Sequence, residues 1–465
     1  MATKRESILL ITILFSLIGF GVIGLQILPH IPILFGIALL LLFGLFKRIP
    51  WSVMDTGIRN GITPGIPSIF IFLLVGVLIA IWIACGTIPT MMVYGFSIVS
   101  KQFFLATVFV VCAIVGTSIG SAFTTAATVG IAFMGMGHAL GYDTAITAGA
   151  IISGAFFGDK MSPLSDTTNL APAVSGVDMF DHIRNMLWTT IPAFIISVIL
   201  FAIVGQGHAA TVDFHTFQAT LQKHSTISWI TLLPVVLLLI LAMKKVPAIP
   251  TLFVGTLSGI IILFLFHPHT SISNLISIMQ DGYKSQTGMK EIDQLLTRGG
   301  MQSMLPSVSL IFLSLGMGGL LQEMGIIAQV MDSLSHFVRT SGRLIFSTAL
   351  TAIGVNFLLG EQYLSIILPG RAYSESFDRI GLKRRNLSRV LEDAGTVVNP
   401  LVPWGVSGVF LSGVLNVPTF SYVPYTFFCL LCPVITIIVG FTGIGLSWVN
   451  GNSPIGKSVR TKTEA

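Results

Sequence analysis

Two polar stretches interrupt sequence that is otherwise almost uncharged. Residues 158–169 read GDKMSPLSDTTN, and residues 392–404 read EDAGTVVNPLVPW. Both supply carboxylate, amide, hydroxyl and main-chain oxygens, which are the ligands that hard cations such as sodium prefer. A carboxylate at the bilayer centre costs about 2.5 to 3.5 kcal/mol by insertion scales, so acids in such sequence indicate a function. The two stretches therefore predict an ion pathway.

The candidate residues lie in these stretches and in a second polar pair, 116–128 and 354–365. The predicted ion- and proton-binding residues are Asp159, Asp166, Thr167, Asn169, Asn356, Glu361, Gln362, Asp393, Thr396 and Asn399, with Thr168 and Glu392 as further candidates. Three of these, Asp159, Asn399 and Glu361, are the expected ligands of a transported sodium ion. The hydroxyls of Thr117, Ser118, Thr124 and Thr125 are expected to line the substrate path, unless they bond their own helix backbone.

Prolines add main-chain oxygens to both sets. A proline has no N–H for the carbonyl four residues back, so Pro163 is expected to free the carbonyl of Asp159 and Pro403 that of Asn399. A competing interpretation is that Asp159 only pairs with its neighbour Lys160. Because adjacent residues on a helix point in different directions, we favour the ion-binding role.

Composition defines the class of protein. Of 465 residues, 53% are hydrophobic and 9% are charged, far below the charge content of a soluble protein. The apolar runs approach the roughly 20 residues that a spanning helix needs, so we expect an all-α polytopic membrane protein. Net charge is +6, but Lys and Arg flank the apolar segments, which argues against a nucleic-acid partner. The four cysteines lie in apolar sequence, and no cofactor is expected.

Charge placement predicts the topology. Lys4 with Arg5, Lys244 with Lys245, and the basic cluster in 371–389 are expected in the cytoplasm, together with both termini. Polar segments 207–228 and 267–302 carry acids and bases in mixture and are expected outside.

An internal repeat is visible at a spacing of 240 residues, which places Gly120 on Gly360 and Pro163 on Pro403. The spacing suggested further along is 232, and near the start it is 218. Because the first repeat begins outside and the second inside, we expect two inverted-topology repeats with re-entrant hairpins and broken helices that meet at the midplane. The predicted units are an N-terminal helix (1–30), a first repeat (31–206), an external loop and linking helix (207–248), a second repeat (249–446) and a cytoplasmic tail (447–465).

The motif in 158–169, supported by VPWGVSG in 402–408, resembles the NhaC family of sodium/proton antiporters, and the resemblance covers nearly the whole chain. It implies a homodimer in the bacterial cytoplasmic membrane that exports sodium in exchange for protons by an elevator-like displacement. Sodium and proton would compete for buried carboxylates under alternating access. Some relatives are similar to exchangers of malate and protons for lactate and sodium, so an organic acid, held by Lys160 or Arg371, is a second candidate cargo.

A membrane enzyme and a passive channel are two alternatives to a transporter. A membrane enzyme is not expected, because the chain has no H-E-x-x-H motif and no G-x-S-x-G elbow in a suitable context. A passive channel differs from an antiporter in one measurable property, since its sodium flux is not tied to an opposite movement of protons.

Overall fold

The computed structural model describes residues 2–98, 102–206, 214–335 and 340–449. In these ranges the regular elements are helices, and the β-type pairing is limited to two isolated β-bridges, Tyr283–Arg298 and Leu382–Trp448. A backbone in lipid must satisfy its hydrogen bonds within its own segment, which favours helices. The expected all-α fold is confirmed.

The elements of the first part of the chain are α1 (Lys4–Gly19), η1 (Phe20–Gly24), α2 (His30–Phe46), α3 (Trp51–Ile62), η2 (Thr63–Gly65), α4 (Ile66–Ala84), α5 (Thr87–Ile98), α6 (Phe104–Ile119), α7 (Ala122–Thr125), η3 (Ala126–Gly130), α8 (Ile131–Ala139), α9 (Thr144–Met161), α10 (Asp166–Ser175), α11 (Met179–Val204), α12 (Phe214–His224), η4 (Trp229–Leu232) and α13 (Leu233–Met243).

The elements of the second part are α14 (Ala248–Phe266), α15 (Ile272–Asp281), α16 (Lys290–Leu296), α17 (Met301–Glu323), α18 (Ile326–Ser335), α19 (Ser341–Leu359), α20 (Gln362–Ile380), α21 (Arg384–Leu391), η5 (Glu392–Thr396), η6 (Asn399–Leu401), α22 (Val406–Leu415), α23 (Thr419–Tyr422), η7 (Val423–Tyr425) and α24 (Phe427–Thr442). Of the short segments, η1, η3 and η5 are π-helices and the others are 3-10 helices.

Broken helices accompany the spanning ones. Among the described residues, six helices are long and apolar enough to cross a membrane, and nine spans result if each of three bent pairs is one span. The bends are 88° between Thr216–His224 and Trp229–Met243, 45° between Arg384–Leu401 and Val406–Leu415, and 60° between Thr419–Tyr425 and Phe427–Thr442. The chain is a multi-pass membrane protein. Segment 207–228, expected as a polar loop, instead contains helix α12, while its residues 207–213 lie outside the described ranges.

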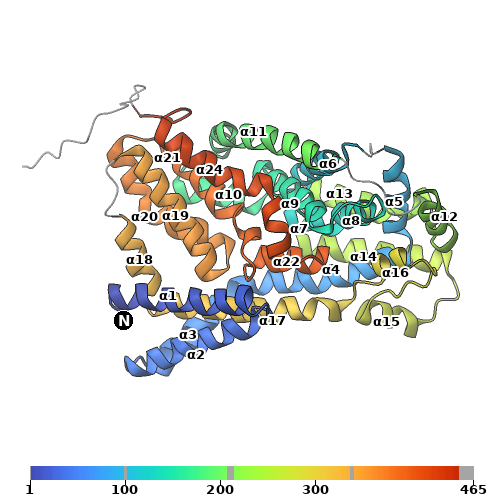
Figure 1. The fold of residues 1–465 in the computed structure, drawn as a ribbon, viewed down its shortest axis with the longest axis horizontal. Helices are drawn as coiled ribbons and strands as arrows, with labels where there is room; N and C mark the ends of the chain where they lie inside the picture. The colour runs from blue at the N-terminus through green and yellow to red at the C-terminus, as the bar shows by residue number, and fades with distance from the viewer. Residues whose placement is uncertain (1, 99–101, 207–213, 336–339, 450–465) are drawn as a thin grey trace, which may run out of the picture.

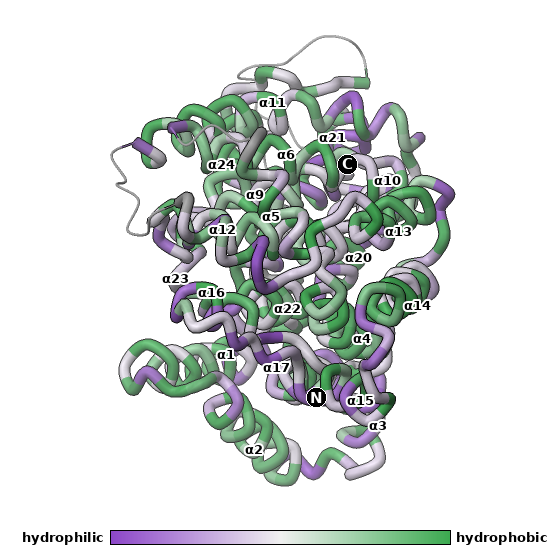
Figure 2. The backbone as a smooth tube through the Cα atoms, turned by 90° about the vertical axis from the view of Figure 1, so that its right-hand side faces the viewer, coloured by the Kyte–Doolittle hydropathy of each residue, from purple (hydrophilic) through white to green (hydrophobic). Residues whose placement is uncertain are grey.

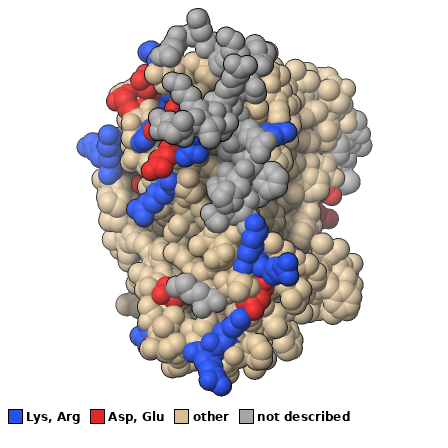
Figure 3. Space-filling model, turned by 90° about the vertical axis from the view of Figure 1, so that its left-hand side faces the viewer, with Lys and Arg blue, Asp and Glu red and all other residues tan. Residues whose placement is uncertain are grey.

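Long helices run side by side along the longest axis of the molecule (Figure 1), with α12, α15 and α16 at one end. The N-terminus and the α20–α21 junction lie at the other end, which we call the N-terminal face. Lys and Arg side chains gather on this face (Figure 3). Peripheral helices such as α2 and α14 are strongly apolar (Figure 2), and their outward residues, Phe35, Leu42 and Ile261 among them, are exposed as a lipid contact requires.

Helix bounds repeat at the 240-residue spacing. Three helix pairs begin at equivalent residues, namely α9 and α21 at Thr144 and Arg384, α10 and α22 at Asp166 and Val406, and α11 and α23 at Met179 and Thr419. The left-handed caps of α10 and α22, Gly176 and Asn416, are also 240 residues apart. The helices therefore do not follow the 232-residue spacing that the sequence suggested here. The opposite direction of the two halves across the membrane stays a prediction.

Glycines let α6 and α9 cross closely. A Cβ added at Gly158 would lie 2.4 Å from the backbone carbon of Gly116, and one at Gly154 would lie 2.3 Å from the carbonyl oxygen of Phe109. Because no side chain separates the two backbones at these points, the C-terminal turn of α9 is held against α6. That turn carries Asp159 and Lys160.

Candidate ion-binding site

A cavity of about 830 Å³ lies at the first polar stretch and is the centre of the candidate site. It reaches from the break after α9 to the α13–α14 junction, where Lys245 lines it. Six of the predicted residues line it, namely Asp159, Asp166, Thr167, Asn169, Gln362 and Thr124. Ser121, Ser165 and Tyr363 line it as well, although they were not among the predicted residues. Residues from both halves of the chain thus line one cavity.

Asp159 sits on the last turn of α9, and only 8% of its surface is exposed. Ser165 and Ala122 line the same cavity as Asp159. Ser165 and Ser121 cap the N-termini of α10 and α7, so two helices begin beside the acid. Helix N-termini favour negative charge, which helps to hold a carboxylate at this depth.

A second acid approaches from the other half of the chain. Glu392 begins the π-helix η5, is fully buried, and accepts a hydrogen bond of 3.2 Å from the Thr167 hydroxyl. It lies close enough to Asp159 for the two charges to interact. Sequence reasoning named Glu392 only as a further candidate. Its position in a π-helix is a signal of function, since π segments within helices are frequent at functional sites. This signal comes from the structure, because a sequence does not show where a π segment occurs.

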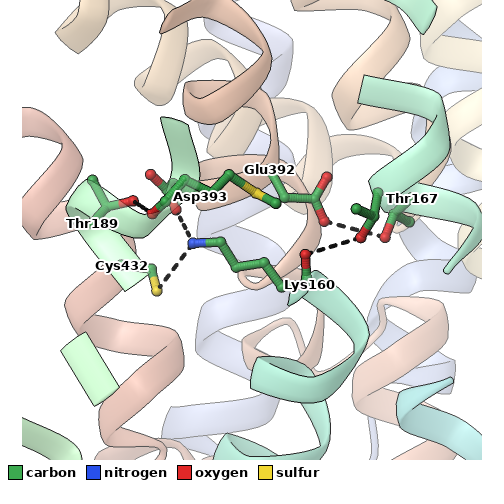
Figure 4. A network of polar contacts seen from close by, with 8 residues as sticks. Lys160, Thr167, Thr189, Glu392, Asp393 and Cys432 are labelled. Carbon is green, nitrogen blue, oxygen red and sulfur yellow. Dashed lines mark hydrogen bonds and ion pairs between the residues drawn. The ribbon is translucent and has the colours of Figure 1, made fainter. Parts of the chain in front are cut away.

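Lys160 does not pair with Asp159. Its ammonium group forms an ion pair with Asp393 of η5 and lies 3.7 Å from the Cys432 sulfur (Figure 4). Both Lys160 and Asp393 are fully buried. The neighbouring residues of α9 therefore face different partners, Asp159 the cavity and Lys160 the second half. The alternative that Asp159 merely neutralises Lys160 is wrong.

Three predicted ligands lie at the cavity wall near α10. Asp166 is exposed there, and the Tyr363 hydroxyl donates a 3.5 Å hydrogen bond to it. Asn169 is also exposed, but its amide donates to the carbonyls of Pro163 and Ser165 at 3.1 and 2.7 Å. Gln362 reaches the cavity from α20 and accepts a bond from the Ser407 hydroxyl. Asp166 thus places a solvent-exposed carboxylate at the cavity wall.

The predicted amides of the second half form a brace. The Asn399 amide donates to the side-chain oxygen of Asn356 at 2.8 Å, and the Asn356 amide donates to the Gly395 carbonyl at 2.7 Å. The Asn399 side-chain oxygen accepts from the Ser407 N–H at 2.8 Å. These bonds tie α19, η5, η6 and α22 together. Thr396, one turn after Glu392, is fully buried beside this brace.

Glu361 occupies a position apart from the cavity. It is the N-cap of α20, follows the left-handed Gly360, and accepts a 2.7 Å bond from the Leu364 N–H. Its equivalent at the 240-residue spacing, Ser121, caps α7 in the same way. Glu361 is buried, yet it is not among the residues that line the cavity around Asp159.

The expected free carbonyls are occupied. The Asp159 carbonyl accepts hydrogen bonds from the Ser162 N–H and the Thr168 hydroxyl, the latter at 3.0 Å. The Asn399 carbonyl accepts from the Val402 N–H at 3.1 Å. The expectation that Pro163 and Pro403 leave these oxygens open is wrong, because the turn that follows each break supplies new donors.

Most of the predicted path hydroxyls bond their own helices. Thr117 and Ser118 donate to the carbonyls of Ala113 and Ile114, and Thr125 donates to that of Ser121. Among these four predicted residues, Thr124 is the one that lines the cavity. The other three hydroxyls donate to backbone carbonyls instead of lining the substrate path, as is common for Ser and Thr in helices.

The arrangement suits a transported cation better than a resident metal. In the described ranges no group of three His, Cys, Asp or Glu side chains is placed to hold a metal ion. The cavity instead offers Asp159, Asp166 and the hydroxyls of Ser165 and Thr167, with Glu392 behind Thr167. Carboxylate and hydroxyl oxygens are the ligands of hard cations.

Comparison with known proteins decides the family. A family model described as the Na+/H+ antiporter family matches residues 154–444, more than half of the chain. The chain belongs to this family. It is 44% identical to the Na(+)/H(+) antiporter NhaC of Alkalihalophilus pseudofirmus OF4, over 96% of this chain and 97% of the relative, so the resemblance to NhaC antiporters is confirmed.

Other relatives of this antiporter family member carry different names. The chain is 36% identical to the arginine/ornithine antiporter ArcD of Halobacterium salinarum, over 93% of this chain and 90% of the relative. It is 35% identical to the malate-2H(+)/Na(+)-lactate antiporter of Bacillus subtilis 168, over 89% of each. All three relatives are transporters, and the expectation that the chain is not an enzyme is confirmed. The family match contains Asp159, Lys160, Glu392 and Asp393.

Proposed function

We propose that this protein exchanges sodium for protons across the bacterial cytoplasmic membrane, with Asp159 and Glu392 as the carboxylates for which the two ions compete. The observation that carries the proposal is that Asp159 and Thr167 line one cavity, while the Thr167 hydroxyl donates a hydrogen bond to Glu392 of the other half of the chain. The similarity to the NhaC antiporter of A. pseudofirmus supports the choice of ions.

Competition follows from the cost of burying charge. A bare carboxylate is expensive at membrane depth, whereas a protonated one, or one with a bound cation, is less so. Asp393 already has the Lys160 ammonium as its counter-charge, but Asp159 and Glu392 have no such partner among the contacts described. These two acids therefore gain most from a proton or a sodium ion. Asp166 and Gln362 complete the predicted ligand set at the cavity wall.

Coupling requires that the loaded site reorients and that the empty one does not. When both are ionised, the Asp159 and Glu392 carboxylates repel each other. A proton or sodium ion relieves the repulsion, so occupied states are the ones that can cross. We place the open end of the present cavity in the cytoplasm because Lys245 lines it and basic residues mark cytoplasmic segments. Both termini would lie on that side, and two copies would form the stationary scaffold.

Proton movement in inverted membrane vesicles tests the proposal. Addition of sodium should drive protons across the membrane in vesicles that contain the protein, and Asp159→Asn or Glu392→Gln should abolish the response. Asp143→Asn is a matched control, because Asp143 caps the opposite end of α9, is exposed, and does not line the cavity. Sodium flux without opposite proton movement would indicate a channel and contradict the proposal.

A coupled organic acid is the second candidate. The cavity of about 830 Å³ is much larger than a sodium ion, and one relative is named as a malate/lactate exchanger. Of the cations that the sequence offered for a carboxylate, Lys160 is committed to Asp393, and Arg371 is exposed outside the cavity wall. Lys245 is the cation that lines the cavity. Sodium efflux from proteoliposomes with and without malate or lactate separates the two cargos.

A further inference from the structure

Polar residues of α11 and of α21–η5 face each other behind the ion site, on the side away from the cavity. We call this set the α11–α21 ladder, and its members are His182, Asn185 and Thr189 of α11 with Ser388, Arg389 and Asp393 of α21–η5. None of them lines the cavity at Asp159. The spacing of three and four residues puts the α11 members on one helix face.

Direct contacts join the two sides. His182 Nδ1 and the Ser388 hydroxyl are 2.9 Å apart, and the Asn185 amide donates to the Arg385 carbonyl at 2.7 Å. Arg389 donates to the Asn185 side-chain oxygen at 3.5 Å. Thr189 comes next on α11, where its hydroxyl donates to the Met186 carbonyl at 3.1 Å. The ladder thus begins one residue after the exposed Asp181 and ends at the Lys160–Asp393 ion pair.

The ladder is buried but its hydrogen bonds are incomplete. His182, Thr189, Ser388, Arg389 and Asp393 are fully buried, and Asn185 is 4% exposed. Within the described part of the chain, several of its buried polar atoms have no hydrogen-bond partner, namely His182 Nε2, Arg389 Nε and Nη2, Asp393 Oδ2 and the adjacent Glu392 Oε2. Buried polar groups in proteins are nearly always paired, commonly with internal water. A row of such atoms therefore indicates bound water molecules.

We propose that the α11–α21 ladder is a hydrated route that carries protons between the N-terminal face and Glu392, separate from the cavity through which sodium reaches Asp159. This inference rests on the antiport function proposed above. A proton taken up at the His182 end passes between hydrogen-bonded waters, and the last water gives it to Glu392 Oε2, which has no hydrogen-bond partner among the described residues. The Lys160–Asp393 ion pair keeps both of its charges.

The groups that face the ladder include poor ligands for sodium. Lys160 of α9 and Arg389 of α21 offer only N–H donors, and Cys432 of α24 adds only a sulfur. The Asn185 side-chain oxygen already accepts a hydrogen bond from Arg389, although oxygen is what sodium needs as a ligand. A proton instead moves by exchange along hydrogen bonds, for which His182 and Glu392 are suitable groups.

Hydration is tested by radiolytic footprinting, in which side chains beside bound water are oxidised. Met186 lies between two α11 residues of the ladder, Asn185 and Thr189, and its carbonyl accepts from Thr189. Met92 lies in the apolar core, and both methionines are fully buried. We expect Met186 in the intact protein to be oxidised at least tenfold faster than Met92. Equal rates would show that the ladder is dry and would overturn the proposal whatever ions are transported.

The proton route is tested in proteoliposomes with Thr189→Val, which removes the α11 hydroxyl of the ladder. We expect sodium-driven proton movement to fall at least tenfold, while exchange of sodium for radioactive sodium at equal pH stays within twofold. Ser197→Ala is the control, because Ser197 is on the same buried face and bonds its own helix at Ala193. Unchanged proton movement, or equal loss of both activities, would overturn the route. Absence of sodium-driven proton movement in the unmodified protein would refute the antiport proposal instead.

Discussion

The Lys160 ammonium of α9 and the Asp393 carboxylate of η5 form an ion pair in which both side chains are completely buried. The pair joins a helix of the first half of the chain to a π-helix of the second, 233 residues later. Two charges removed from water are costly unless each compensates the other. This pair therefore ties the two halves together next to the acids proposed to bind the ions.

Loss of one member of the pair should destabilise the protein strongly. Lys160→Met leaves Asp393 as an uncompensated buried charge, which we expect to cost about 3–5 kcal/mol. The double variant Lys160→Met with Asp393→Leu should recover most of that loss, because no charge then remains. Thermal unfolding in detergent measures both, with Lys245→Met as an exposed control. A single variant as stable as the double one would contradict the buried pair.

Thr167 should matter for sodium affinity. Its hydroxyl lines the cavity and donates to Glu392, so Thr167→Val leaves the acid with one hydrogen bond fewer and the cavity with one oxygen ligand fewer. A hydrogen bond to a charged group contributes about 1.5–3 kcal/mol, and we expect sodium binding, measured by calorimetry, to weaken at least tenfold. Thr147→Val is the control, since that hydroxyl bonds its own helix at Asp143. Equal affinities of the two variants would remove Thr167 from the site.

A role of Glu361 as the N-cap of α20 can be distinguished from a role in ion binding by replacing it with another capping residue. The equivalent residue of the first half, Ser121, caps its helix with a hydroxyl. Glu361→Ser should therefore keep both the fold and sodium-driven proton movement, whereas Glu361→Ala should lose about 1 kcal/mol of stability as a lost N-cap does. Loss of transport in a stable Glu361→Ser protein would instead support the ion-binding role predicted from the sequence.

The segment 284–297 should respond to acid. The Thr287 N–H, and then the Ser285 and Thr287 hydroxyls, hydrogen-bond Asp293 and hold its pKa below the usual value. A lowered carboxyl pKa adds stability above the unfolded value of about 3.9, and this stability is lost as pH falls through the folded pKa. Limited proteolysis should therefore cut this segment faster at pH 3 than at pH 7.

A neutral side chain should mimic the acid state. Asp293→Asn should be cut quickly at both pH values, while Glu291→Gln on the same helix α16 should behave like the unmodified protein. Cleavage of the unmodified segment at the same rate at pH 3 and pH 7 would argue that Asp293 does not hold it.

The amino-acid sequence is sufficient to predict a helical protein that lies in a membrane. Long apolar runs exclude a soluble fold, and the prolines and polar residues of 158–169 and 392–404 mark where helices break. These features depend on neighbours along the chain, so they can be read locally. The 240-residue spacing added the pairing of the two halves, which the helix bounds follow from α9 to α23.

Which side chains face each other follows from the packing of the helices and could not be predicted from the sequence. The close crossing of α6 and α9 at Gly116 and Gly158 sets the rotation of α9, and this rotation turns Asp159 to the cavity and Lys160 to Asp393. The same packing brings Glu392 to Thr167 and leaves Glu361 as a helix cap. A side chain's direction depends on the helices packed against it, and those contacts join residues hundreds of positions apart, beyond what local sequence records.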